Sequence, residues 1–396
     1  QWRKNLYTMM ITQICCMIGF GLVSPFIAFY FQEMGMEMGA KLDLAVSLAN
    51  TLPAVGMAIA SPIWGMLSDR YGRKSMLVRA CTFAGILMIL MGLVDSVLPF
   101  LLLRLLQGFF TGTVTASMAF VSANTPEEHM SASLGMLSAS NFIGFSIGPV
   151  MGGLMAEWIG YTNCFFVASA LMFFATFIVV AVTVEDPSTY GKELVEKSRA
   201  RKLEQKQKRA GAAVSGLRAV SPVIISLFAV LLIQRTARMA FTPFLALYVE
   251  DVRGTMEWAS GITGIINGSV CIATSISSVT LVRLADRYDK ISLILLYAVS
   301  LLLIPNVSLV FFAVSYTMYY FIYGAIEPII TAALSEHTPP ESRGTLFGWI
   351  GTFQNLAGIF GPLLGSAISA AFSGYQSILA AISVMVAVVI CCIAFV

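Results

Sequence analysis

Charged side chains are scarce in this chain. They make up 11% of its 396 residues, against the roughly 25% that is usual in soluble domains. A water-soluble protein of this length could not cover its surface with so few charges. Histidine occurs only as His129 and His337, both in polar stretches, which excludes a histidine-rich metal centre. The seven cysteines lie in apolar runs, singly or as adjacent pairs, and predict neither a disulfide framework nor a metal site.

The signatures of catalysis and of nucleotide use are also missing. No Gly-x-x-x-x-Gly-Lys-Ser/Thr loop is present to cradle the phosphates of ATP, and no cluster of His, Asp or Ser suggests a membrane enzyme. The net charge of +3 gives no basic footprint for a nucleic acid. We therefore expect no enzymatic activity, no bound cofactor and no nucleic-acid partner.

Long apolar runs are what the chain has in abundance. Apolar residues make up 58% of it, and the mean hydropathy is +0.83. Because a bilayer core needs about 20 apolar residues per helix, the runs predict an all-α membrane protein with about twelve spans, a count of eleven or thirteen remaining open. The spans are expected near 6–31, 43–66, 75–94, 97–121, 132–157, 161–183, 220–249, 258–284, 291–313, 316–335, 343–371 and 376–396.

Lysine and arginine predict the orientation. Nineteen of the 24 basic residues fall on one side of the membrane if twelve spans alternate, and only Lys41 and Arg253 lie in opposite loops. Basic loops stay in the cytoplasm, so both termini and the central loop are expected there. The only long polar stretch divides the chain into an N-terminal six-helix bundle (1–184), a cytoplasmic linker (185–218) and a C-terminal six-helix bundle (219–396).

The two halves repeat one another in sequence. Three motifs of the first half recur in order in the second, two of them 213 positions on and the third 217 positions on. They are Thr125-Pro126 with Thr338-Pro339, Gly148-Pro149 with Gly361-Pro362, and Leu67-Ser68-Asp69-Arg70-Tyr71 with Leu284-Ala285-Asp286-Arg287-Tyr288. Such a parallel duplication is one of the known designs of transporters.

The loop between spans two and three carries a resemblance. The stretch from Gly65 to Lys74, with Asp69, Arg70, Gly72 and Arg73, resembles the signature loop of the major facilitator superfamily. The resemblance implies two pseudo-symmetric bundles that rock about a central cavity in alternating access. It also implies that Asp69 and Arg73 form a latch between the cytoplasmic ends of the bundles. The alternative is a basic loop that only closes a hairpin.

Two further motifs favour export within that superfamily. Arg104 in span four resembles an arginine implicated in proton handling in drug/proton antiporters, although it could instead snorkel to the interface. The glycine pattern of span five resembles the superfamily's antiporter motif, and glycines four apart permit close helix contact. Its residues are Gly144, Gly148, Pro149 and Gly152.

Charges at membrane depth predict the central site. Arg235 and Arg238 lie in span seven and Glu327 in span ten, and such residues are expected to face a wet cavity or one another. Glu327 is a candidate to exchange a proton for substrate; the alternative is a static salt bridge with Arg235. By resemblance, spans one, four, seven and ten line the cavity. Further candidates for it are Gln13, Tyr323, Asn141, Gln354 and Asn355.

These patterns predict a proton-coupled exporter of amphipathic, drug-like small molecules. The proton gradient is its expected energy source and the bilayer its surroundings. We expect a monomer in the bacterial inner membrane. Export of a specific metabolite, siderophore or lipid, facilitated uniport and nutrient import remain alternatives.

Overall fold

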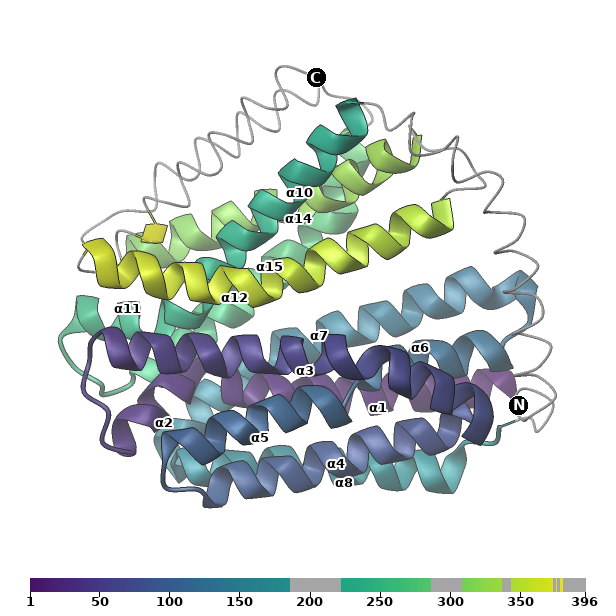
Figure 1. Cartoon of the computed structure of the whole chain (residues 1–396), viewed down its shortest axis with the longest axis horizontal. Coiled ribbons are helices and arrows are strands. Elements are labelled where there is room, and N and C mark those ends of the chain that lie inside the picture. Colours follow the sequence, from purple (N-terminus) through teal and green to yellow (C-terminus); the bar gives the residue numbers. More distant parts are fainter. Residues whose placement is uncertain (186–221, 286–307, 337–342, 373–374, 376–377, 380–396) are drawn as a thin grey trace.

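The computed structural model describes residues 1–185, 222–285, 308–336, 343–372, 375 and 378–379 (Figure 1). Every regular element in these residues is helical. Eight of the described helices are long and apolar enough to cross a membrane. The predicted all-α membrane architecture is therefore confirmed, while most of the linker and most of the ninth and twelfth predicted spans lie outside the described residues.

The first six predicted spans each correspond to helical structure. Span one begins as α1 (Trp2–Val23), passes through a 3-10 turn (η1, Ser24–Phe26) and ends as α2 (Ile27–Glu33). The others are α3 (Ala40–Tyr71), α4 (Arg73–Leu93), α5 (Val97–Phe110) with α6 (Thr113–Asn124), α7 (Glu127–Ile159) and α8 (Tyr161–Val182).

The second half follows the same plan where it is described. Span seven is α10 (Pro222–Phe241), a 3-10 turn (η4, Thr242–Phe244) and α11 (Leu245–Arg253). It is followed by α12 (Ala259–Ala285), α14 (Leu309–Glu336) and α15 (Arg343–Phe372). One predicted boundary was wrong: residues 309–313 begin α14 and do not end the ninth span.

The interruptions of spans one and seven are equivalent. Ser24-Pro25-Phe26 and Thr242-Pro243-Phe244 form the two 3-10 turns, 218 positions apart. Proline has no amide hydrogen to donate, so the helical hydrogen-bond ladder cannot continue through it unchanged. The duplication therefore includes these two proline-containing 3-10 turns, which were not among the three repeated motifs recognised from the sequence.

Span four is broken, where the sequence predicted one continuous helix. Gly112 has φ +114°, a conformation that side-chain-bearing residues avoid, and it separates α5 from α6. The amide and the hydroxyl of Thr111 both donate to the carbonyl of Gln107, at 2.9 and 2.6 Å, and so close the last turn of α5. The break puts an unwound stretch inside the bilayer, where backbone polar groups need local partners.

The helices form two groups that meet at one end of the molecule. Helices α1, α4, α7 and α8 pack together and α3 packs on α5, while α10 packs on α15 and α12 on α14. Between the groups, α7 contacts α12 and α3 contacts α15. In Figure 1 the groups approach one another where α2 and α11 lie and diverge toward the N-terminus. We call these ends the closed end and the N-terminal end.

Helix α7 lies against α1 along its glycines. A Cβ added at Gly144 would lie 2.9 Å from the carbonyl oxygen of Ile14, and one at Gly148 would lie 2.8 Å from that of Ile18. A Cβ at Gly152 would overlap the carbonyl oxygen of Leu22. The close contact expected of these glycines is therefore present, whatever its part in antiport.

Gly152→Ala tests this contact, with Gly135→Ala as its control on the same helix. The added methyl of Gly152→Ala must push α7 from α1, and overpacking of this kind costs about 1–3 kcal/mol. Gly135 has nothing within 4 Å of an added Cβ, so its variant should keep the native stability. Thermal unfolding in detergent measures both; equal midpoints would contradict the packing.

Candidate transport pathway and its closure

Gln13 ties span one to the break in span four. Its side chain is fully buried on α1, and its Nε2 donates to the carbonyl of Thr113, the first residue of α6, at 2.8 Å. Its Oε1 has no hydrogen-bond partner among the described residues. A buried acceptor left open in this way is costly, and the role of Gln13 in the substrate cavity stays a prediction.

Arg104 lies on α5 with 9% of its surface exposed. One guanidinium nitrogen donates to Oε1 of Gln107 at 2.9 Å, and the guanidinium carbon lies 5.5 Å from the ring centre of Phe100. The side chain is largely enclosed by protein, which favours burial over snorkelling to the interface. Its part in proton handling stays a prediction.

Arg238 meets a column of tyrosines on α14. Its guanidinium carbon lies 5.3 Å from the ring centre of Tyr323, within reach of a cation–π interaction. The hydroxyl of Tyr320 lies 3.3 Å both from that of Tyr316 and from that of Thr242. The structure thus brings span seven and span ten together around Arg238, with a polar edge on an otherwise aromatic wall.

The remaining central candidates are less gathered. Arg235 is half-buried one turn before Arg238, and Glu327 follows Tyr323 by four residues on α14, although its side chain lies outside the described residues. Asn141 on α7 is half-buried, and its Oδ1 has no hydrogen-bond partner among the described residues. On α15, Gln354 is half-buried and Asn355 is exposed.

The signature loop is a tight helix–helix turn at the N-terminal end. Gly72, with φ +91°, ends α3 and precedes α4, and its amide donates to the carbonyl of Ser68 at 3.1 Å. Arg70 is exposed over the ring of Tyr71, and an added Cβ at Gly65 would meet nothing within 4 Å. The side chain of Asp69 lies outside the described residues, so the predicted latch stays a prediction.

The loop binds an acid that sequence reasoning missed. The carboxylate of Glu185 accepts from the backbone amides of Arg73 at 2.7 Å and Lys74 at 2.9 Å, and so caps the N-terminus of α4. In return, Nζ of Lys74 donates to the carbonyls of Val180 and Thr183 at the end of α8. No local motif marks Glu185, because its partners lie more than 110 positions away.

Asn5 reinforces this arrangement from the start of the chain. Its Nδ2 donates to the carbonyl of Val184 at 2.8 Å, and its Oδ1 accepts from the amide of Val184 at 3.2 Å. The end of span six is therefore held by the first helix and the fourth. Together Asn5, Lys74, Val184 and Glu185 form what we call the Glu185 clasp.

Polar contacts join the two halves at the closed end. The carboxylate of Asp43, 3% exposed at the start of α3, accepts from the hydroxyls of Ser369 at 2.8 Å and Tyr375 at 3.0 Å. Glu157 of α7 accepts from the hydroxyl of Ser260 on α12, and Nε2 of Gln32 donates to Glu250 at 2.9 Å. None of these residues was predicted, because only the tertiary fold brings them together.

The contacts between the halves have two-fold pseudo-symmetry. The hydroxyl of Ser47 donates to the carbonyl of Pro362 at 2.8 Å. The equivalent residues in the duplication are Gly264 and Pro149, and Gly264 lies against the carbonyl oxygen of Pro149. The hydroxyl of Thr51 donates to the carbonyl of Ile359 at 3.2 Å. The equivalents of these two residues are Gly268 and Ser146, and a Cβ added at Gly268 would lie 3.4 Å from the carbonyl oxygen of Ser146.

Comparison with known proteins agrees with this geometry. The sequence model described as Major Facilitator Superfamily matches residues 9–323 and, in a second match, residues 227–396. The chain belongs to the Major Facilitator Superfamily. It is a membrane transport protein and not an enzyme, as predicted.

Two relatives within the Major Facilitator Superfamily are similar over nearly the whole chain. A protein named multi-drug resistance efflux pump PmrA homolog, from Lactococcus lactis subsp. lactis, is 31% identical over 96% of this chain and 91% of its own length. A protein named multidrug resistance protein MdtG, from Yersinia enterocolitica, is 29% identical over 97% of this chain and 91% of its own.

Solved structures of the superfamily share the fold at low identity. A bacterial homolog of the human lysosomal transporter Spinster, in an inward-facing and occupied conformation, superposes with a TM-score of 0.76 at 14% identity over 98% of this chain and 95% of its own. A D-xylose-proton symporter gives 0.71 at 14% identity, over 97% and 96%. At such identities these likenesses establish the fold alone.

Glu185→Ala tests the clasp. The amides of Arg73 and Lys74 lose their acceptor, and loss of a helix cap costs about 0.5–2 kcal/mol, so the midpoint of thermal unfolding should fall by a few degrees. Glu37, exposed in the loop before α3, supplies the matched control Glu37→Ala. A midpoint unchanged by Glu185→Ala would contradict the capping role.

Asp43→Ala tests the closed end. Two hydroxyls lose a charged acceptor, and hydrogen bonds to charged groups contribute about 1.5–3 kcal/mol, so the ratio of closed to open molecules at this end should fall about tenfold or more. Electron–electron distances between spin-labelled amino acids encoded at Lys41 and Met256 report that ratio. Asp95→Ala, at an exposed acid of the same end, should leave the distance distribution unchanged. If Asp43→Ala gave the same distribution as Asp95→Ala, the closed end would not depend on Asp43.

Proposed function

We propose that this chain exports amphipathic, drug-like small molecules in exchange for protons. The observation that carries the proposal is the identity of about 30%, over more than nine-tenths of the chain, with proteins named for multidrug efflux. The antiporter glycines of α7 and the paired cationic and aromatic groups of α10 and α14 support it. Likeness to the D-xylose-proton symporter is a likeness of fold and favours no sugar substrate.

The charge bias of the loops supports an orientation with the N-terminal end in the cytoplasm. The closed end is then extracellular, and the structure corresponds to the inward-facing state of an alternating-access cycle. Export requires this end to open, so the hydrogen bonds of Asp43, Ser47 and Thr51 must break once in each cycle. Water and lipid headgroups reach the same groups once they part, which limits the net cost of breaking them.

The cavity between spans one, four, seven and ten is the proposed substrate site. Arg238 offers a cation beside aromatic faces, and Oε1 of Gln13 is an acceptor without a hydrogen-bond partner among the described residues. Such a mixture of apolar area with a few polar anchors suits amphipaths of varied shape. Three arginines within the spans favour anionic or zwitterionic substrates over simple cations.

Glu327 is the proposed proton-exchanging carboxylate. It lies on α14 one turn beyond Tyr323, whose ring contacts Arg238. A carboxylate near an arginine in a membrane interior gains or loses that interaction when its proton leaves or binds. Protonation of Glu327 would then release Arg235, and deprotonation would restore the pair.

Transport by reconstituted protein under an imposed pH gradient tests this coupling. Proteoliposomes loaded with fluorescent anionic and cationic amphipaths should show gradient-driven flux that reverses with the gradient. Glu327→Gln should reduce that flux to the level measured without a gradient. Glu128→Gln, at an exposed acid at the start of α7, should retain it.

Two results would sink parts of the proposal separately. Flux that ignores the gradient in the native protein would replace antiport by facilitated transport. Gradient-driven flux that survives Glu327→Gln would keep antiport and assign the carboxylate a structural role.

A further inference from the structure

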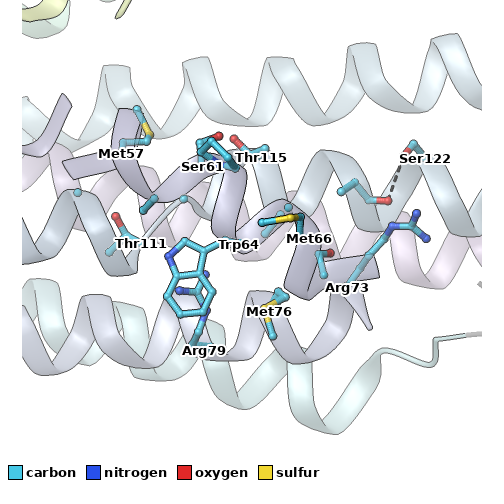
Figure 2. Close-up of a pocket in the computed structure, with 18 residues that line it drawn as sticks. Met57, Ser61, Trp64, Met66, Arg73, Met76, Arg79, Thr111, Thr115 and Ser122 are labelled. Carbon is cyan, nitrogen blue, oxygen red and sulfur yellow. Dashed lines mark hydrogen bonds between the residues drawn. The ribbon is translucent and has the colours of Figure 1, made fainter. Parts of the chain in front are cut away.

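A cavity lies within the N-terminal half, between spans two, three and four. It has a volume of about 530 Å³ and opens between α3 and α6, with α4 as its floor (Figure 2). Its walls are formed by small residues on the facing helices, among them Ser61 and Gly65 of α3 and Thr115 and Ala119 of α6. Helix α3 packs closely on α5 as far as the turn at Gly112, where α5 gives way to α6. The small side chains of α6 after this turn do not fill the space between α6 and α3.

Arg79 supplies the charge of this cavity. Its guanidinium carbon lies 3.4 Å from the ring centre of Trp64, and Figure 2 shows the two side chains stacked where α3 crosses α4. Trp64 is held in turn, because its Nε1 donates at 2.7 Å to the carbonyl of Phe109, near the broken end of α5. Trp64 therefore holds the guanidinium of Arg79 in place, and the hydrogen bond to Phe109, beside the break in span four, holds Trp64.

The hydrogen-bonding capacity of the Arg79 guanidinium is only partly used. Its Nε and one Nη are buried and have no hydrogen-bond partner among the described residues. Among the described side chains that line the cavity there is no carboxylate; besides Arg79 they include Arg73 and are otherwise neutral. A stacked guanidinium presents its free N–H groups in one plane, the geometry that suits phosphate or carboxylate oxygens.

The depth of Arg79 fits the headgroup of a membrane amphipath. It follows the start of α4 at Arg73 by six residues, about 9 Å along the helix axis. The interfacial zone of a bilayer is roughly 5–8 Å thick on each side, so Arg79 lies near the boundary between headgroups and acyl chains. The methionines Met57, Met66 and Met76 line the same cavity and can adapt to a flexible chain.

We propose that this cavity binds the anionic headgroup of a membrane amphipath, a phosphate carried on an apolar tail, with Arg79 and Trp64 as its anchor. The volume accommodates a headgroup with part of a chain and not a whole phospholipid. The source can be a phospholipid of the leaflet at the N-terminal end or a single-tailed phosphate amphipath. The cavity borders span four, which the proposed substrate site shares, but its anchor residues Arg79 and Trp64 lie on α4 and α3, which are not among the spans proposed to line the substrate site.

Quenching of Trp64 by brominated lipids tests the site directly. The full chain, with Trp2, Trp158, Trp258 and Trp349 replaced by Phe, is placed in nanodiscs of phosphatidylcholine that contain either dibrominated phosphatidylglycerol or dibrominated phosphatidylcholine. Half-maximal quenching should require about tenfold less of the anionic lipid, as expected for one charge-assisted contact. Equal quenching by the two lipids in this protein would overturn the proposal, whatever any variant does.

Two substitutions separate the anchor from general surface charge. Arg79→Gln should abolish the preference for the anionic lipid, whereas Arg79→Lys, which keeps the charge, should retain part of it. Lys4→Gln removes the same charge at an exposed residue of the same end and should retain all of it. A preference that survives Arg79→Gln, or that Lys4→Gln abolishes equally, would refute the site.

Competition identifies the source of the headgroup. Dodecyl phosphate should restore the fluorescence quenched by brominated phosphatidylglycerol if any single-tailed phosphate amphipath can enter. Restoration would support a site open to both sources, and persistent quenching would support one that holds bilayer phospholipid alone. Transport assays do not enter this experiment, so its failure and that of the proposed export are distinguishable.

Discussion

Backbone contact at glycines is the constraint on which this architecture depends. Helix α7 meets α1 of its own half through Gly144, Gly148 and Gly152, and on another side meets α12 of the other half through Gly153. A membrane interior offers no hydrophobic gain for bringing two apolar helices together, so close van der Waals packing must hold them. Because α7 has small residues on two sides, it can pack closely against α1 of its own bundle and against α12 of the other bundle at the same time.

The contacts between the halves are not identical on the two sides of the pseudo-symmetry axis. Where α3 meets α15, hydroxyls of Ser47 and Thr51 bind carbonyls; where α7 meets α12, the equivalent positions are Gly264 and Gly268. Nearer the closed end the α7–α12 side has hydrogen bonds as well, because Glu157 accepts from the hydroxyl of Ser260 and from the amide of Gly261. Both sides therefore combine close packing with hydrogen bonds, and they differ in which positions supply them.

The sequence predicted features that depend on the chain's own periodicity. Long apolar runs predicted the helices, and the glycine spacing of 144, 148 and 152 predicted a close helix contact. It did not predict the break at Gly112, because an isolated glycine in an apolar run is common and only tertiary packing decides whether the helix yields there. It also missed Asp43 and Glu185, whose partners lie more than 100 positions away. The side chains of Glu327 and Asp69 lie outside the described residues, so the roles assigned to them stay predictions.

The hydrogen bond between Gln32 and Glu250 joins equivalent positions of the two halves, since they are 218 residues apart, as are the two proline turns. A residue that touches its own equivalent lies on the two-fold axis, as at the centre of an isologous homodimer. In an ancestor made of two identical chains this contact could only pair like with like, and two glutamates there would repel. Joining the copies in one polypeptide released the position from that symmetry, so one side could become an amide that donates to the carboxylate of the other.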